Sequence, residues 1–336
     1  MDKVAKQRLE ALSNVVCNTP LAKINFKYKG EARSIYAKLE YFNFSGSIKD
    51  RMAYYILKTA YENGAIKPGD EISEATSGNT GIAFSSQGAF LGHKVVIFMP
   101  NWMSQERISL IGSLGAKIVL ITKEEGGFLG SIQRSKDYAK KGNVFLPLQF
   151  ENDNNRMAHY TTTGPEIWNQ MEKFGVKPDA FVAGVGTGGT IMGAGGYLKS
   201  KNASVKLYPM EPANSPTMTT GGKKIGSHRI QGISDEFIPE IVKLDQLDEI
   251  VSVDDGDSII MAQMLAKVFG MGVGISSGAN MIAAIKIQNE YGKQNVATVF
   301  SDDSKKYLST DYVRTEPVKP GFLSTDVELI SFETVK

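Results

Sequence analysis

The feature that most constrains the fold is a regular alternation, from about Glu71 onward, between short β-branched or apolar runs and longer segments with helical periodicity. This alternation is typical of parallel sheets whose strands are joined by crossover helices. The expected strands are KVVIFMP, KIVLIT, PDAFVAGVG, VKLYPMEP and NVATVFSD. The expected helices are MSQERISLIGSLGA, GTIMGAGGYLKS, DGDSIIMAQMLAKVFG and GANMIAAIKIQNEY. We therefore expect an α/β protein.

The two series of elements are separated by the polar stretch QFENDNN (149–155), which has no periodicity, and we expect the domain junction there. The chain has 336 residues, of which 42% are hydrophobic, so it can form two domains of the usual size. Two domains commonly enclose a cleft. The tail after Asp311 predicts only an extended path, because of its two prolines.

The charge pattern indicates a small-molecule partner. The 38 basic and 36 acidic residues are dispersed and give a net charge of +2, so we expect neither nucleic acid nor an anionic membrane as a partner. The start of the chain, MDKVAKQRLEALSNVVCNTPL, has neither a signal-peptide core nor a membrane-spanning run. We expect a cytoplasmic protein.

Cysteine and histidine usage indicates no catalytic metal. Cys17 is the only cysteine, which excludes an intrachain disulfide and a cysteine-based metal site. We expect it to be a small buried hydrophobe. His93, His159 and His228 share no ligand spacing.

Two glycine-bearing loops stand where a strand passes into a helix, EATSGNTGIA and AGVGTGGTIMG. Ligands of open α/β sheets bind at such junctions, where backbone N–H groups and a helix N-terminus suit a carboxylate or a phosphate.

The second loop also fits a dinucleotide-binding pattern. Gly184, Gly186 and Gly189 have the required spacing, and Glu211 lies where a ribose-binding acid is expected. A dehydrogenase is therefore an alternative. The two threonines of the loop favour a compact monophosphate instead, and Glu211 stands directly before a proline.

Six motifs in the same order resemble the cysteine synthase and cystathionine β-synthase family of pyridoxal-phosphate enzymes. They are SGSIKDR, TSGNTG, GVGTGGT, HRIQGI, GISSGA and KYLST, and the likeness extends to MSQER and TTGPEIW. The resemblance implies a two-domain fold of the tryptophan synthase β type, with pyridoxal 5'-phosphate in the cleft, and a homodimer. It divides the chain into a smaller mobile domain with the substrate loop (46–156) and a larger cofactor-binding domain (1–45 plus 157–336).

The resemblance also assigns roles to residues. Lys49 would form the Schiff base and later remove the substrate's Cα proton, and Asn79 would bind the ring oxygen of the cofactor. Ser276 would face the pyridine nitrogen. The substrate carboxylate would be held by Thr76, Ser77, Gly78, Thr80 and Gln149, and the cofactor phosphate by Gly186, Thr187, Gly188, Gly189 and Thr190.

A neutral serine at the pyridine nitrogen leaves the ring unprotonated, which favours loss of a group from Cβ over transamination. The expected chemistry is β-elimination or β-replacement through an α-aminoacrylate.

One turn departs from the family pattern. After HRIQGI the family continues with small residues, whereas this chain has SDE (234–236). By resemblance, Asp235 lies at the cleft mouth, where like charges ~4 Å apart cost on the order of 4 kcal/mol at an effective dielectric constant near 20. Bisulfide would therefore be a poor attacking group and a plausible leaving group. A carboxylate would instead attract the ammonium group of an amino-acid thiol or accept its thiol proton.

We therefore expect L-cysteine as the first substrate, with release of hydrogen sulfide and addition of a second L-cysteine to give lanthionine. Water would give pyruvate and ammonia as a side reaction. In the alternative, SDE is a surface turn and the protein is a cysteine synthase that uses O-acetyl-L-serine. A non-catalytic amino-acid-binding relative is a third possibility. A further departure, SDDSKK, makes Asp303 a candidate neighbour of the pyridine nitrogen.

Overall fold

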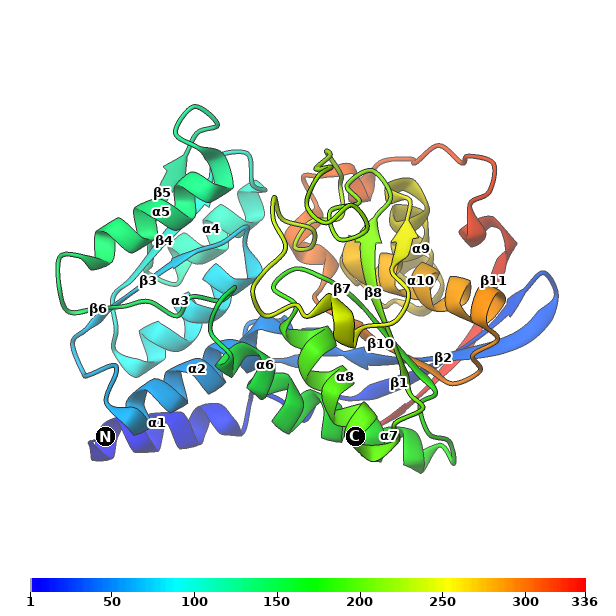
Figure 1. The fold of residues 1–336 in the computed structure, drawn as a ribbon, viewed down its shortest axis with the longest axis horizontal. Coiled ribbons are helices and arrows are strands. Elements are labelled where there is room, and N and C mark those ends of the chain that lie inside the picture. Colours follow the sequence, from blue (N-terminus) through cyan, green and yellow to red (C-terminus); the bar gives the residue numbers. More distant parts are fainter. Residues whose placement is uncertain (1) are drawn as a thin grey trace.

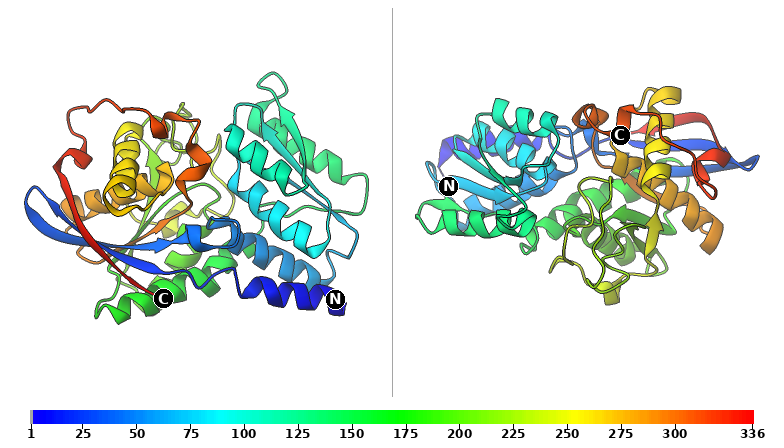
Figure 2. Two further views of the ribbon diagram at one scale, coloured as in Figure 1. Left: turned by 180° about the vertical axis from the view of Figure 1, so that it is seen from behind. Right: turned by 90° about the horizontal axis from the view of Figure 1, so that it is seen from above.

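The computed structural model describes residues 2–336, and its two sheets are each covered by helices on both faces (Figures 1 and 2). The strand order is β11-β1-β2-β10-β7-β8-β9 in the larger sheet and β5-β4-β3-β6 in the smaller one. The prediction of an α/β fold with mostly parallel sheets flanked by helices is confirmed.

The smaller sheet is entirely parallel. Its strands are β3 (Glu71–Ala75), β4 (Val95–Pro100), β5 (Lys117–Ile121) and β6 (Val144–Phe145). Every residue of β4 is buried, as expected for a strand covered on both faces. One face packs against α1 (Lys3–Ser13), α2 (Lys49–Asn63), α3 (Asn79–Leu91) and α4 (Gln105–Ser113), and the other packs against α5 (Gly127–Ala139).

The larger sheet has a parallel part and an antiparallel part. Its strands are β1 (Leu21–Tyr28), β2 (Glu31–Leu39), β7 (Ala180–Gly184), β8 (Lys206–Pro212), β9 (Val251–Val253), β10 (Val296–Phe300) and β11 (Val327–Val335). Strand β2 runs parallel to β10, and the order continues in parallel through β7, β8 and β9. Strand β1 pairs antiparallel with both β2 and β11.

Helices on the two faces of the larger sheet form separate cores. One face packs against α9 (Asp255–Phe269) and α10 (Ile275–Tyr291), and the other packs against α7 (Gly164–Lys173) and α8 (Gly189–Lys201). The side chain of Asp254 caps α9 by accepting from the Gly256 N–H, and Gly270 ends the helix in the left-handed conformation. Short helices complete the chain: η1 (Glu40–Phe42), α6 (Asn154–Ala158), η2 (His159–Thr163), η3 (Leu244–Gln246), η4 (Ser304–Tyr307), η5 (Asp311–Val313) and η6 (Leu323–Asp326).

The antiparallel part of the larger sheet was not predicted. The tail was expected only to be extended, yet β11 pairs with β1 from Leu21 with Val335 to Tyr28 with Val327, with one register shift between Asn25 and Phe26. Pairing between segments about 300 residues apart leaves no local pattern in the sequence.

The division of the chain at residues 46–156 stays a proposal. Helix α1 lies in the part of the chain assigned to the larger domain, but its apolar residues Ala5, Leu9 and Leu12 share the core of the smaller sheet. Helix α1 therefore packs with the smaller sheet, although the proposed division assigns it to the larger domain.

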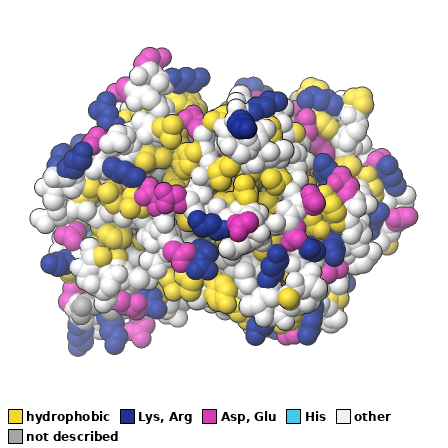
Figure 3. All heavy atoms as spheres, viewed as in Figure 1, with side chains coloured by type: hydrophobic (Ala, Val, Ile, Leu, Met, Phe, Trp, Pro, Cys, Tyr) yellow, Lys and Arg dark blue, Asp and Glu magenta, His cyan; other side chains and the backbone are white. Residues whose placement is uncertain are grey.

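Acidic and basic side chains are interspersed over the face shown in Figure 3, without a block of one sign. None of the helices in residues 2–336 is long and apolar enough to cross a membrane.

Candidate active site

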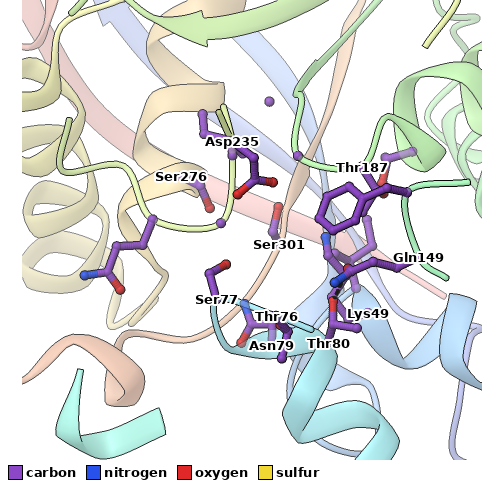
Figure 4. A pocket seen from close by; sticks show the side chains of 18 of the residues that line it. Lys49, Thr76, Ser77, Asn79, Thr80, Gln149, Thr187, Asp235, Ser276 and Ser301 are labelled. Carbon is purple, nitrogen blue, oxygen red and sulfur yellow. Dashed lines mark hydrogen bonds between the residues drawn. The ribbon is translucent and has the colours of Figure 1, made fainter. Parts of the chain in front are cut away.

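A pocket is lined by residues that follow strands of both sheets (Figure 4). Of the predicted site residues, it brings together Lys49, Thr76, Ser77, Asn79, Thr80, Gln149, Gly186, Thr187, Thr190, Asp235 and Ser276. Gly78, Gly188 and Gly189 belong to the same loops but do not line the pocket. The chain thus concentrates residues from six distant motifs in one space.

Lys49 begins α2, and its backbone N–H donates to Ser47 Oγ at 3.3 Å. Burial lowers the pKa of the Lys49 amine, and the carboxylates of Asp302 and Asp235 act in the opposite direction. A lysine with a lowered pKa is available as a neutral amine, which is the form that attacks a carbonyl or removes a proton.

Asn79 is the first residue of α3, and its side chain contacts Asp302. The Asn79 Nδ2 donates to Asp302 Oδ2 at 2.7 Å, and the Tyr307 hydroxyl donates to the same oxygen at 2.8 Å. The buried Oδ1 of Asn79 has no hydrogen-bond partner among the described residues. An unpaired buried acceptor costs free energy, and a bound molecule that donates a hydrogen bond to this oxygen would remove that cost.

The expectation for Asp303 is wrong. Its carboxylate accepts from the Lys305 N–H at 2.9 Å and does not line the pocket. The fully buried acid beside the site is the preceding residue, Asp302.

The loop from Thr76 to Thr80 joins β3 to α3. The Thr80 hydroxyl donates to Gln149 Oε1 at 2.7 Å, and Gln149 Nε2 donates to the Ala75 carbonyl at 2.7 Å. Two predicted carboxylate ligands are therefore tied together by a hydrogen bond. Below them, burial raises the pKa of the Glu74 carboxyl to about 7.

The second glycine loop joins β7 to α8. A Cβ at Gly186 would lie 2.5 Å from the Gly232 carbonyl oxygen, and a Cβ at Gly189 would lie 2.0 Å from Asn155 Oδ1. The loop therefore presents backbone N–H groups where side chains cannot fit, at the N-terminus of a helix, which suits a phosphate. The Thr187 hydroxyl oxygen accepts from Asn155 Nδ2 at 2.8 Å and so is held beside the loop.

Asp235 and Ser276 line the pocket opposite the carboxylate loop. Ser276 stands in the first turn of α10. Burial raises the pKa of Asp235 to about 6, while the nearby Lys49 lowers it and Glu236 raises it. The Asp235 side chain is half-buried, and its carboxyl points into the pocket (Figure 4).

A second cavity of about 310 Å³ adjoins the first. The two cavities share the residues Ser77, Phe128, Gln231, Gly232, Ile233 and Asp235. Trp102, Lys123 and Glu236 line the second cavity alone. Asp235 therefore stands at the boundary between the two cavities.

A family model described as "Pyridoxal-phosphate dependent enzyme" matches residues 12–302. This chain is a pyridoxal-phosphate enzyme. It is 41% identical over 301 residues to a probable cysteine synthase of Bacillus subtilis, and the matched region covers 89% of this chain and 96% of the relative. The cysteine synthase relationship that the motifs indicated is thereby confirmed.

Solved structures agree with this assignment. A hydrogen sulfide-producing enzyme of Fusobacterium nucleatum is 56% identical, with a TM-score of 0.94 over 98% of this chain and 100% of that one. A second structure of the hydrogen sulfide-producing enzyme is an aspartate-to-asparagine mutant in complex with an α-aminoacrylate intermediate. It is 56% identical to this chain, and the two superpose with a TM-score of 0.95 over 98% of this chain and 100% of the mutant chain. A cysteine synthase of Entamoeba histolytica is 34% identical, with a TM-score of 0.82 over 94% of each chain.

The dinucleotide alternative is wrong for this pyridoxal-phosphate enzyme. Glu211, the supposed ribose ligand, is fully buried and accepts from the Met218 N–H at 2.7 Å and the Thr219 hydroxyl at 2.5 Å. Its carboxylate stabilises the turn after β8 and does not face a ligand.

The residues present fit the cofactor. The glycine loop at α8 and the lysine with a lowered pKa are the features that its phosphate and aldehyde require. Sequence reasoning did not single out Arg107, Asp302, Gln231 or Ser301, which lie in or directly behind the pocket. All four lie within stretches already quoted: Arg107 in MSQER, Gln231 in HRIQGI, and Ser301 and Asp302 in SDDSKK. Those positions were the available signal.

Proposed function

We propose that this pyridoxal-phosphate enzyme converts two molecules of L-cysteine into lanthionine and hydrogen sulfide. One L-cysteine loses its thiol group from Cβ, and the sulfur of a second L-cysteine bonds to the same carbon. Reaction with water would yield hydrogen sulfide, pyruvate and ammonia from one L-cysteine. The observation that carries the proposal is the Asp235 carboxyl inside the pocket with Lys49.

The cofactor, when bound, withdraws electrons from the bonds at the substrate's Cα, which makes a group at Cβ easy to expel. The chain's own residues have separate tasks in the proposal. Lys49 attaches the cofactor and removes the Cα proton. Thr76, Ser77, Gly78, Thr80 and Gln149 hold the substrate carboxylate. Asn79 and Ser276 bind the ring of the cofactor, and residues 186–190 bind its phosphate.

Asp235 is proposed to act on the second substrate. With a pKa of about 6, its carboxyl is mostly ionised at neutral pH, so it repels bisulfide and attracts an ammonium group. The same carboxylate can accept the proton of the incoming thiol. Because Asp235 borders both cavities, the second amino acid would approach from the adjoining cavity.

A cysteine synthase that joins sulfide to O-acetyl-L-serine is the second candidate. The relationship to proteins named cysteine synthase favours it. In this case the Asp235 carboxylate would oppose the entry of the sulfide anion.

Product analysis separates these candidates. The holoenzyme would be given either isotopically labelled L-cysteine alone or O-acetyl-L-serine with sulfide. Sulfide would be followed with an electrode and amino acids by mass spectrometry. We expect sulfide release and doubly labelled lanthionine from L-cysteine alone.

Labelled serine or pyruvate without lanthionine would show that water, and not a second L-cysteine, is the acceptor. Efficient use of O-acetyl-L-serine with no sulfide release from L-cysteine would reject the proposal. Asp235→Ala should reduce sulfide release, while Asp245→Asn, a change at an exposed carboxylate that lines neither cavity, serves as the control. Unchanged sulfide release by Asp235→Ala would contradict the proposed role.

A cytoplasmic location also belongs to the proposal, as does a homodimer, which rests on the family resemblance. Light scattering of the purified holoenzyme would test the dimer, and a monomer mass would reject it.

A further inference from the structure

The buried guanidinium of Arg107 has no role in the function proposed above. Arg107 lies on α4 and is only 1% exposed. Burying a charge is costly unless an opposite charge accompanies it. The two other fully buried cations on β2 and α2 follow this rule: Arg51 contacts Glu40 at 2.6 Å, and both Arg51 and Lys38 contact Glu166 at 2.8 Å.

Arg107 has only neutral contacts. Its Nη1 donates to Ser104 Oγ at 3.3 Å and to Gln231 Oε1, and its guanidinium carbon lies 4.5 Å from the centre of the Tyr307 ring. Within residues 2–336, no carboxylate oxygen lies within 4.0 Å of its guanidinium nitrogens. The positive charge of Arg107 therefore lacks a direct counter-ion.

Two acids close to Arg107 in the structure, Asp302 and Glu106, are hydrogen-bonded to other groups. Asp302 lies beyond the Tyr307 hydroxyl, which donates to it at 2.8 Å. Glu106 accepts from the backbone N–H and the hydroxyl of Ser309, at 2.5 and 2.6 Å. The charge of Arg107 contributes to lowering the pKa of the Glu106 carboxyl, but neither carboxylate forms an ion pair with the guanidinium.

Arg107 packs against the backbone of the proposed carboxylate loop. A Cβ at Gly78 would lie 2.1 Å from Arg107 Cδ and 2.5 Å from its Nε, so only glycine permits this approach. The next residue, Asn79, begins α3, whose N-terminus adds a partial positive charge at the same point. The loop thus combines a helix N-terminus with a buried cation.

We propose that Arg107 is a positioning residue whose charge makes the Thr76–Thr80 loop selective for amino acids with a free α-carboxylate. The counter-ion missing from the protein is the carboxylate of the bound substrate. Arg107 acts through the loop, because it does not line the pocket itself. This inference rests on the part of the proposed function that assigns the substrate carboxylate to this loop.

The test compares ligands with and without a carboxylate. L-Alanine and L-alaninamide would be titrated into holoenzyme and followed by the absorbance of the bound cofactor. Neither ligand carries a leaving group, so the result does not depend on which donor or acceptor the enzyme uses. The variants are Arg107→Gln and Arg107→Lys, and Arg134→Gln removes an equal charge from an exposed position near the smaller sheet.

A unit charge roughly 6–8 Å from an anion, at an effective dielectric constant near 20, changes affinity by about 30–100-fold. We expect Arg107→Gln to raise the Kd of L-alanine by about that factor and to leave the Kd of L-alaninamide within roughly threefold of the wild-type value. Arg107→Lys and Arg134→Gln should keep the wild-type ratio of the two Kd values. The melting temperature of Arg107→Gln should not fall, because an unpaired buried charge is removed.

Equal weakening of both ligands by Arg107→Gln would overturn the inference, because a purely structural role affects both alike. Unchanged binding of L-alanine would also overturn it. If Arg107→Gln does not fold, Arg107→Lys decides: a raised Kd ratio of L-alanine to L-alaninamide would reject a role for the charge. Failure of lanthionine formation would leave these binding results unaffected, so the two proposals can be rejected separately.

Discussion

Asp235 should reduce the stability of the protein at neutral pH, and Asp235→Asn should remove this cost. Burial raises the pKa of this carboxyl from 3.8 to about 6, so the folded state holds the proton more tightly than the unfolded state. Above pH 6 the carboxyl is ionised in both states, and the full cost of burying the charge is present. Below pH 3.8 it is protonated in both states, and the cost disappears.

The magnitude follows from the size of the shift. About two pKa units at 1.36 kcal/mol each give about 3 kcal/mol at pH 7.5, and roughly half of that at pH 5. For a protein of 336 residues, an unfolding entropy of about 2 cal/mol/K per residue converts 3 kcal/mol to a gain of roughly 4 °C in Tm. Asp235→Asn keeps the shape of the side chain and removes only its charge.

Scanning calorimetry of the holoenzyme at pH 7.5 and pH 5 provides the measurement. We expect Asp235→Asn to melt higher than the wild type, by a margin that narrows at pH 5, while sulfide release from L-cysteine falls. Asp245→Asn is the control, because Asp245 is exposed, lines neither cavity and should give no comparable gain. A Tm at or below the wild-type value at pH 7.5, or a gain of equal size at both pH values, would refute the reasoning.

Three further changes test the site and its surroundings. Lys49→Ala should abolish borohydride-stable labelling by the cofactor and reduce sulfide release by roughly 10²–10⁴-fold, since a general base is lost; retained labelling would contradict the assignment. Gly78→Ala should lower the free energy of unfolding by about 1–3 kcal/mol, measured by denaturant titration, because its Cβ would overlap Arg107 and its φ of +154° disfavours a side chain; wild-type stability would count against this packing. Burial would raise the pKa of the Glu166 carboxyl, but Arg51 and Lys38 hold it at about 2. Glu166→Gln should therefore lower the free energy of unfolding by about 3 kcal/mol above pH 4.5, and this loss should shrink as the pH falls toward 2. A loss of stability that does not depend on pH would be inconsistent with this ion pair.

Local patterns predicted the parallel core of the fold. The stretch KVVIFMP forms β4, whose six residues are all buried, because a strand covered on both faces has to be apolar throughout. The glycines of the second loop also reflect a local requirement. Gly188 has a φ of +85° directly before α8, and this conformation favours glycine at that position. Burial and backbone conformation of this kind are recorded within a few neighbouring residues.

The sequence by itself determined the α/β class, the two glycine loops and the lysine motif that precedes them, because each depends on short-range periodicity or on a contiguous motif. Only the tertiary structure decided which charges meet. Asp302 and Asp303 are adjacent, yet one is buried against Asn79 and the other caps a short helix, since successive side chains of an extended segment point in opposite directions. Whether Arg107 has a counter-ion likewise depends on residues far away in the chain. Pairings of this kind are set by the packing of whole elements, for which no local pattern exists.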